Sequence, residues 1–111
     1  MIAKYRKKEL QMFHLTDYIF KHELETFCLK HHIIKMSLFG SALRDELTPD
    51  SDIDILVEFD KKQMPGLLDI AGIEIELSDK LGRKVDLRTP VELSRYFRDD
   101  VLKKSRVEYA A

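Results

Sequence analysis

The stretch from Asp52 to Glu58 constrains the fold more than any other part of the chain. Its β-branched apolar residues alternate with acidic ones, so that every second side chain lies on the same side of an extended backbone. This period of two predicts a strand with one apolar face and one face that carries carboxylates. A strand of this kind must cover its apolar face, so we expect a sheet packed against helices.

Two other segments are also predicted to be strands. Residues 33–39 are short and mostly apolar, and they stop at Gly40, which is typical of a buried strand that ends in a turn. Residues 83–88 form another alternating segment, in which Asp86 points away from the apolar side chains. We therefore expect at least three strands in one sheet.

Helical patterns flank these strands. The first predicted helix runs from Thr16 to about His31, and the last begins at the capping sequence 89–92. A middle helix is predicted to end at Gly82, which occupies the position of a C-terminal glycine stop. Its expected apolar face consists of Leu68, Ala71, Ile75 and Leu81.

The order of these elements predicts an α/β (α+β) fold in a single domain over residues 1–111. We expect an N-terminal helical part at 1–32, a sheet core at 33–88 and a C-terminal helix at 89–111.

Composition excludes several classes of protein. The chain is 44% hydrophobic and 35% charged, which favours a folded domain, and its net charge of -1 argues against a nucleic-acid module. No run of 18 apolar residues is present to span a membrane. Cys28 is the only cysteine, so we expect it in the core, without an internal disulfide, and we expect the protein in the cytoplasm.

The acidic residues of two predicted strands are candidate metal ligands. Asp52 and Asp54 stand two positions apart, so they project from the same face about 7 Å apart. If the strand that contains Asp86 lies beside them, the three carboxylates can hold two divalent cations for a displacement at phosphorus. Magnesium suits such hard oxygen ligands.

Gly40 and Ser41 follow a predicted strand and begin a turn or helix. Backbone N–H groups at such a point are free to bind phosphate oxygens, and glycine lets the backbone approach the anion closely. An Asp-x-Asp pair alone is weak evidence for a metal site, because a chain with eleven aspartates can contain one by chance. The pair is more specific here, since ten residues separate Ser41 from Asp52 and a strand lies on each side.

Simpler interpretations remain for several residues. The three aspartates could be solvated carboxylates at strand edges. His31 and His32 cannot share one face of a helix, and we interpret them as a helix terminus rather than a zinc site. A basic run at residues 4–8 is expected to be solvated rather than to bind nucleic acid.

The residues around the Gly-Ser turn resemble the polymerase-β-like nucleotidyltransferase superfamily, and most closely its minimal nucleotidyltransferases. The resemblance extends from about Ile33 to the C-terminus, although Asp45 stands where many members have a glycine. It is carried by Leu38–Phe39–Gly40–Ser41, Arg44, Thr48–Pro49–Asp50–Ser51–Asp52–Ile53–Asp54, Val57–Glu58–Phe59 and Leu81–Gly82–Arg83–Lys84–Val85–Asp86–Leu87.

This resemblance implies a mixed sheet flanked by helices, and an enzyme that uses ATP and two Mg²⁺ ions. The implied nucleotide-binding residues are Gly40, Ser41 and Arg44, and the implied catalytic metal ligands are Asp52, Asp54 and Asp86. Asp86 is also implied to act as the base that activates an acceptor hydroxyl.

The resemblance also implies a partner. Minimal nucleotidyltransferases are typically encoded with HEPN-domain proteins, which implies an antitoxin that adenylylates a tyrosine of a HEPN ribonuclease toxin, in a hetero-oligomeric complex. Two alternatives remain at this stage. The chain could be a non-catalytic antitoxin that covers its partner, or it could transfer a nucleotide to a small molecule or, less consistently with its near-neutral charge, to an RNA end.

Overall fold

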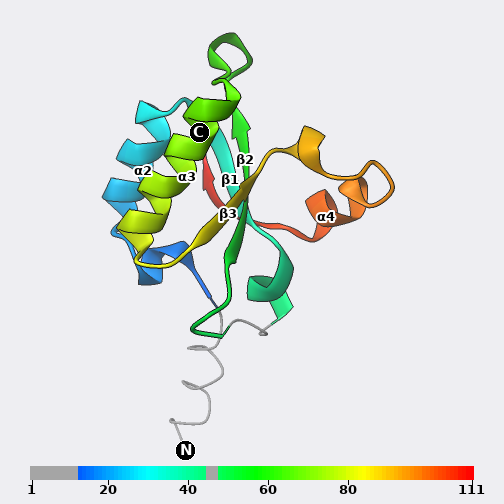
Figure 1. Cartoon of the computed structure of the whole chain (residues 1–111), viewed down its shortest axis with the longest axis horizontal. Helices are drawn as coiled ribbons and strands as arrows, with labels where there is room; N and C mark the ends of the chain where they lie inside the picture. The colour runs from blue at the N-terminus through cyan, green and yellow to red at the C-terminus, as the bar shows by residue number, and fades with distance from the viewer. Residues whose placement is uncertain (1–12, 45–47) are drawn as a thin grey trace, which may run out of the picture.

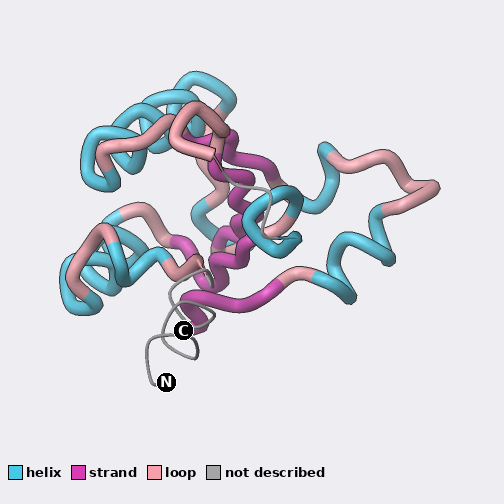
Figure 2. Tube along the Cα trace, turned by 90° about the horizontal axis from the view of Figure 1, so that it is seen from below, coloured by secondary structure: helices cyan, strands magenta, loops and turns pink. Residues whose placement is uncertain are grey.

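The computed structural model describes residues 13–44 and 48–111, apart from the side chain of Arg44. These residues form one mixed sheet with helices on both of its sides (Figures 1 and 2). The helices are α2 (Lys21–Lys30), α3 (Leu67–Leu81) and α4 (Arg98–Lys104), and the strands are β1 (Ile33–Leu38), β2 (Ile53–Phe59), β3 (Val85–Arg88) and β4 (Arg106–Ala110). Short 3₁₀ turns cover Leu15–Asp17, Gly40–Arg44, Lys61–Gln63 and Pro90–Glu92.

The sheet has the strand order β3-β2-β1-β4. β1 is antiparallel to both β2 and β4, whereas β2 and β3 are parallel and are joined through α3. The predicted α+β fold with a mixed sheet is therefore confirmed. Within the described part of the chain, no helix is long and apolar enough to cross a membrane.

The predicted alternation of β2 is confirmed. Ile53, Ile55 and Val57 are fully buried on one face, while Asp54 and Glu58 are partly exposed on the other. The buried face packs under α2 and α3, which lie side by side over the sheet (Figure 1). Burial on one side therefore leaves the carboxylates on the opposite side, where α4 lies.

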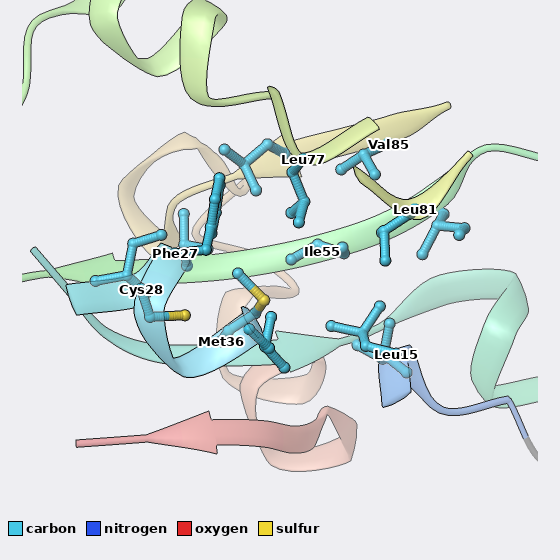
Figure 3. Packing of buried hydrophobic residues seen from close by; sticks show 14 of the residues in the cluster. Leu15, Phe27, Cys28, Met36, Ile55, Leu77, Leu81 and Val85 are labelled. Carbon is cyan, nitrogen blue, oxygen red and sulfur yellow. The ribbon is translucent and has the colours of Figure 1, made fainter. Parts of the chain in front are cut away.

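The core lies between the sheet and these two helices (Figure 3). Cys28 belongs to it, as predicted, and its burial raises the pKa of the thiol to about 12. The largest fully buried side chains of the core include Leu15, Phe27, Met36, Ile55, Leu77 and Val85.

The first predicted helix is wrong at its start. Instead of one helix from Thr16, a 3₁₀ turn covers Leu15–Asp17 and α2 begins only at Lys21. Phe20 has an extended backbone with ψ 144°, which interrupts the helix between the two segments. This break allows Leu15 and Ile19 both to enter the core, while Phe20 stays 70% exposed.

The predicted apolar face of α3 is right at Leu81 but wrong at Leu68, Ala71 and Ile75, which are exposed. Its buried residues are Ile73, Leu77 and Leu81, which are spaced by four and share one face. Leu68 and Ile75 lie on other faces and are 89% and 62% exposed. The glycine stop is confirmed, since Gly82 takes the left-handed conformation at φ 69°.

The C-terminal segment differs most from expectation. The capping interaction forms, because the Thr89 backbone N–H donates to Glu92 at 3.1 Å, but it starts only a 3₁₀ turn. The helix α4 begins later, at Arg98, and residues 106–110 form the edge strand β4 rather than more helix. Pairing with β1, in which Met36 lies opposite Tyr109, is a long-range contact that local periodicity does not reveal.

Candidate active site

Two of the candidate carboxylates face each other across neighbouring strands. In the parallel pair of β2 and β3, Ile53 lies opposite Val85 and Asp54 lies opposite Asp86. Adjacent strands are about 4.8 Å apart, so the two aspartates project side by side from the same face. Asp52 directly precedes β2 at the same end of the sheet, and its side chain is 44% exposed. The pairing of strands that the metal hypothesis required is present.

The environment of Asp54 disfavours an isolated negative charge. Burial raises the pKa of its carboxyl, and the negative charges of Asp86 and Asp52 raise it further. Arg88 and a hydrogen bond from the Ser41 backbone N–H act in the opposite direction without cancelling the rise. A cation bound between these carboxylates would relieve their mutual repulsion.

Two basic residues, Lys84 just before β3 and Arg88 at its end, lie on either side of Asp86 in the sequence. Arg88 donates from Nε to Asp86 Oδ1 at 3.0 Å and from Nη2 to Oδ2 at 3.4 Å. Lys84 Nζ lies 3.8 Å from Asp52 Oδ2, which is an ion pair without a hydrogen bond. In this arrangement, no three acidic, histidine or cysteine side chains of the described residues converge tightly enough to hold a metal ion.

Gly40 begins the turn beside Asp54. Its φ of 73° lies in the left-handed region that favours glycine. A Cβ at this position would overlap Asp54 Oδ2 and would lie only 3.0 Å from Cγ. The Phe39 backbone N–H also donates to the Asp54 carbonyl at 3.1 Å, which joins the turn to β2. The absence of a side chain therefore brings the turn into direct contact with a candidate metal ligand.

The third predicted nucleotide-binding residue is only partly described. The backbone of Arg44 ends the 3₁₀ turn, but its side chain and residues 45–47 lie outside the described residues. The structure thus brings together Gly40, Ser41, Asp52, Asp54 and Asp86, and it does not locate the guanidinium of Arg44.

The model of the nucleotidyltransferase domain family matches residues 21–110. The chain belongs to this family. A relative from Methanocaldococcus jannaschii, provisionally named a protein adenylyltransferase, is 38% identical over 82 residues, which cover 74% of this chain and 86% of the relative. The protein adenylyltransferase MntA of Thermococcus cleftensis is 43% identical over 53 residues, and the match spans only about half of each chain (48% and 52%).

Solved structures share the fold of this nucleotidyltransferase. One provisionally described as a minimal nucleotidyltransferase superposes with a TM-score of 0.64 and 30% identity, over 84% of this chain and 94% of the other. A tri-AMPylated HEPN toxin of Shewanella oneidensis in complex with its MNT antitoxin matches with a TM-score of 0.59 and 17% identity, over 81% and 69%. At that identity, the second likeness extends to the fold alone.

The donor set of this nucleotidyltransferase fits divalent cations. Carboxylate oxygens are the ligands that Mg²⁺ prefers, and Asp54 and Asp86 already share one face of the sheet. Burial first, and then the charges of Asp86 and Asp52, raise the pKa of Asp54, so a cation bound here would favour its charged form. One side chain has to adjust before an ion can be shared, because Arg88 holds Asp86 by two hydrogen bonds, whereas Lys84 lies 3.8 Å from Asp52 without a hydrogen bond.

Sequence reasoning missed the function of Arg83. Its guanidinium donates to the carbonyls of Ser51, at 2.9 Å, and of Thr48. The same turn is closed by the Thr48 backbone N–H, which donates to Ser51 Oγ at 3.0 Å. Arg83 therefore holds the segment that leads directly into Asp52. No spacing in the sequence indicates this contact, because 32 positions separate Arg83 from Ser51.

A cavity of about 520 Å³ opens on the other side of the Gly-Ser turn. It lies between the 3₁₀ turn Gly40–Arg44 and α4, on the sheet face opposite α2 and α3 (Figure 1). Gly40 borders this cavity and also lies against Asp54, whereas none of the three candidate carboxylates lines the cavity. Its lining residues are Phe39, Gly40, Leu43, Asp100, Val101 and Lys104.

Proposed function

We propose that this nucleotidyltransferase transfers AMP from ATP to a hydroxyl group with the help of two Mg²⁺ ions. The observation that carries the proposal is the register of β2 and β3, which sets Asp54 beside Asp86 and next to the Gly40 turn. Carboxylates that can hold divalent cations beside a tight Gly-Ser turn suit in-line transfer at phosphorus.

Each residue has a distinct part in the proposed reaction. Gly40 and Ser41 hold the β- and γ-phosphates, and Arg44 offsets phosphate charge. Asp52 and Asp54 would hold the cations that offset the charge of the triphosphate, and Asp86 would be a ligand of the second cation. The cations would supply charge stabilisation for the attacking and leaving oxygens.

Asp86 is also the proposed base. It accepts the proton of the acceptor hydroxyl as that oxygen bonds to the α-phosphorus. The bond from the α-phosphorus to the bridging oxygen breaks, and pyrophosphate leaves with the electron pair. The acceptor keeps the AMP group as a phosphodiester.

We infer that the acceptor is a tyrosine of a HEPN ribonuclease toxin, which this chain silences as its antitoxin. The inference is supported by the relatives named protein adenylyltransferases, and by the shared fold with an MNT antitoxin bound to an AMPylated HEPN toxin. ATP as donor and a single cysteine without a disulfide are consistent with a cytoplasmic location.

The test combines the purified chain with the protein encoded beside it, Mg²⁺ and ATP labelled at the α-phosphate. We expect label on the partner, and an intact mass that rises by one or more AMP groups. Tandem mass spectrometry should locate the adduct on tyrosine. If the partner carries no label although the enzyme is folded and Mg²⁺ is present, the inference that a HEPN tyrosine is the acceptor would be wrong. Label on an added small molecule alone would support the alternative class of acceptor.

A further inference from the structure

The bidentate pair between Arg88 and Asp86 occupies both oxygens of a proposed metal ligand. Its two hydrogen bonds measure 3.0 and 3.4 Å, and both side chains remain partly exposed, at 47% and 34%. A carboxylate held by a planar guanidinium in this way has its orientation fixed as well as its charge offset. While Arg88 keeps this geometry, it uses one lone pair of each Asp86 oxygen and places its own positive charge beside them, which disfavours coordination of a cation by the same oxygens.

We propose that Arg88 acts as a positioning residue that competes with the second cation for Asp86, and so sets the affinity of the site for divalent metal. This inference rests on the proposed function, in which Asp86 is a metal ligand. In the metal-free protein Arg88 takes the place of the missing positive charge. Metal binding then requires the guanidinium to leave Asp86.

Arg88 has other anionic groups to interact with when it is released. The hydrogen bond to Asp86 is the main cause of its raised pKa, and the charge of Asp86 comes next, but Glu92 and Glu74 also contribute. Glu92 follows β3 in the turn Pro90–Glu92, and Glu74 of α3 accepts from the Leu87 backbone N–H at 2.8 Å. Release of Arg88 therefore does not leave its charge without a counterion.

Lys84 provides a matched comparison. It carries the same charge and directly precedes β3, two residues before Asp86, but its Nζ lies 3.8 Å from Asp52 and makes no hydrogen bond there. Replacing Lys84 removes one positive charge near the metals without releasing a held ligand. An effect of net charge alone should consequently be similar at positions 84 and 88, whereas competition for a ligand should appear only at 88.

The experiment measures Mn²⁺ binding to the full chain without nucleotide, by electron paramagnetic resonance of the free ion. The proteins are the wild type, R88Q, R88K, K84Q and D54N, each checked for folding by circular dichroism. We expect R88Q to lower the Kd for Mn²⁺ about fivefold. The apparent affinity for the ion is proportional to the fraction of protein in which Asp86 is not paired with residue 88, and R88Q raises that fraction. R88K keeps the charge but loses the planar fork, so we expect a drop of about twofold to threefold. K84Q should change the Kd by less than about twofold.

The outcomes separate this inference from the function on which it rests. If wild type and D54N bind Mn²⁺ equally, the metal site is wrong and the inference is wrong with it. When D54N loses binding but R88Q and K84Q shift the Kd equally, or R88K matches wild type, Arg88 acts only as a charge. Weaker binding by R88Q would show that Arg88 supports the metal-bound form instead of competing with it.

Discussion

The Asp54 carboxylate lies against the backbone of Gly40, in space that any side chain at position 40 would fill. Gly40 also has a φ of 73°, so two independent constraints favour glycine there. The turn that follows β1 and the acidic start of β2 thus form one unit, although 14 positions separate the two residues.

Replacing Gly40 by alanine should therefore damage both stability and catalysis. The left-handed backbone costs an L-residue about 1–2 kcal/mol, and the new Cβ must displace Asp54. We expect a lower melting temperature and a loss of transferase activity of more than about tenfold, since Asp54 is a proposed metal ligand. Calorimetry and the labelled ATP assay measure the two effects.

Gly72→Ala is the control for this substitution. Gly72 lies within α3, and a Cβ there meets nothing within 4 Å. Alanine should stabilise the helix by about 0.5–1 kcal/mol and leave transfer unchanged. Equal losses in both variants would contradict the specific role of Gly40.

The double variant Asp52→Ala with Asp54→Ala distinguishes catalysis from simple binding. If the chain transfers AMP, labelling of the partner should fall by more than about a thousandfold, as expected when an essential group is removed. Binding to the partner should persist, because neither carboxylate belongs to the buried core of the fold. Pull-down and labelling are measured on the same samples. Full neutralisation of the toxin by the double variant would favour the antitoxin that acts by covering its partner.

The stability of the metal-free protein should depend on the ionisation of Asp54. Its pKa in the folded state is raised, so the protonated carboxyl is favoured by folding and the charged form is disfavoured. Stability is therefore lost as the pH rises from the unfolded value of 3.8 through the raised folded pKa. We expect Asp54→Asn to be more stable than the wild type at neutral pH, and this advantage to disappear in acid. Urea unfolding across pH 3.5–7.5 with a chelator present would show it; a constant difference would contradict it.

Cys28 should be inert in the native protein. Burial raises the pKa of its thiol to about 12, and the thiolate is the form that reacts. We expect negligible reaction with a chromogenic disulfide reagent at pH 8, and one equivalent of reaction once the protein is unfolded in guanidinium chloride. Rapid modification of the folded protein would mean that the layer formed by α2 opens readily.

Local patterns in the sequence predicted much of the site. The alternation of β2 assigned Asp54 to the face opposite the core, because the side-chain period of a strand depends only on its own backbone. The glycine stop at Gly82 followed from the conformation that glycine alone adopts easily. The Gly-Ser turn and the Asp-x-Asp pair were found because their spacing lies within one stretch of the chain.

Tertiary structure decided what depends on distant neighbours. The pairing of Asp54 with Asp86 comes from the register of two strands that α3 connects, and β4 exists as a strand because β1 offers it an edge. Most of the buried face of α3 was mispredicted: Leu81 is buried as expected, but Ile73 and Leu77 are buried in place of Leu68 and Ile75. Amino-acid type thus determined which residues could be buried or bind a cation. Packing determined which of these residues meet. A contact depends on two residues that can be far apart in the chain, and the local sequence around one of them does not identify the other.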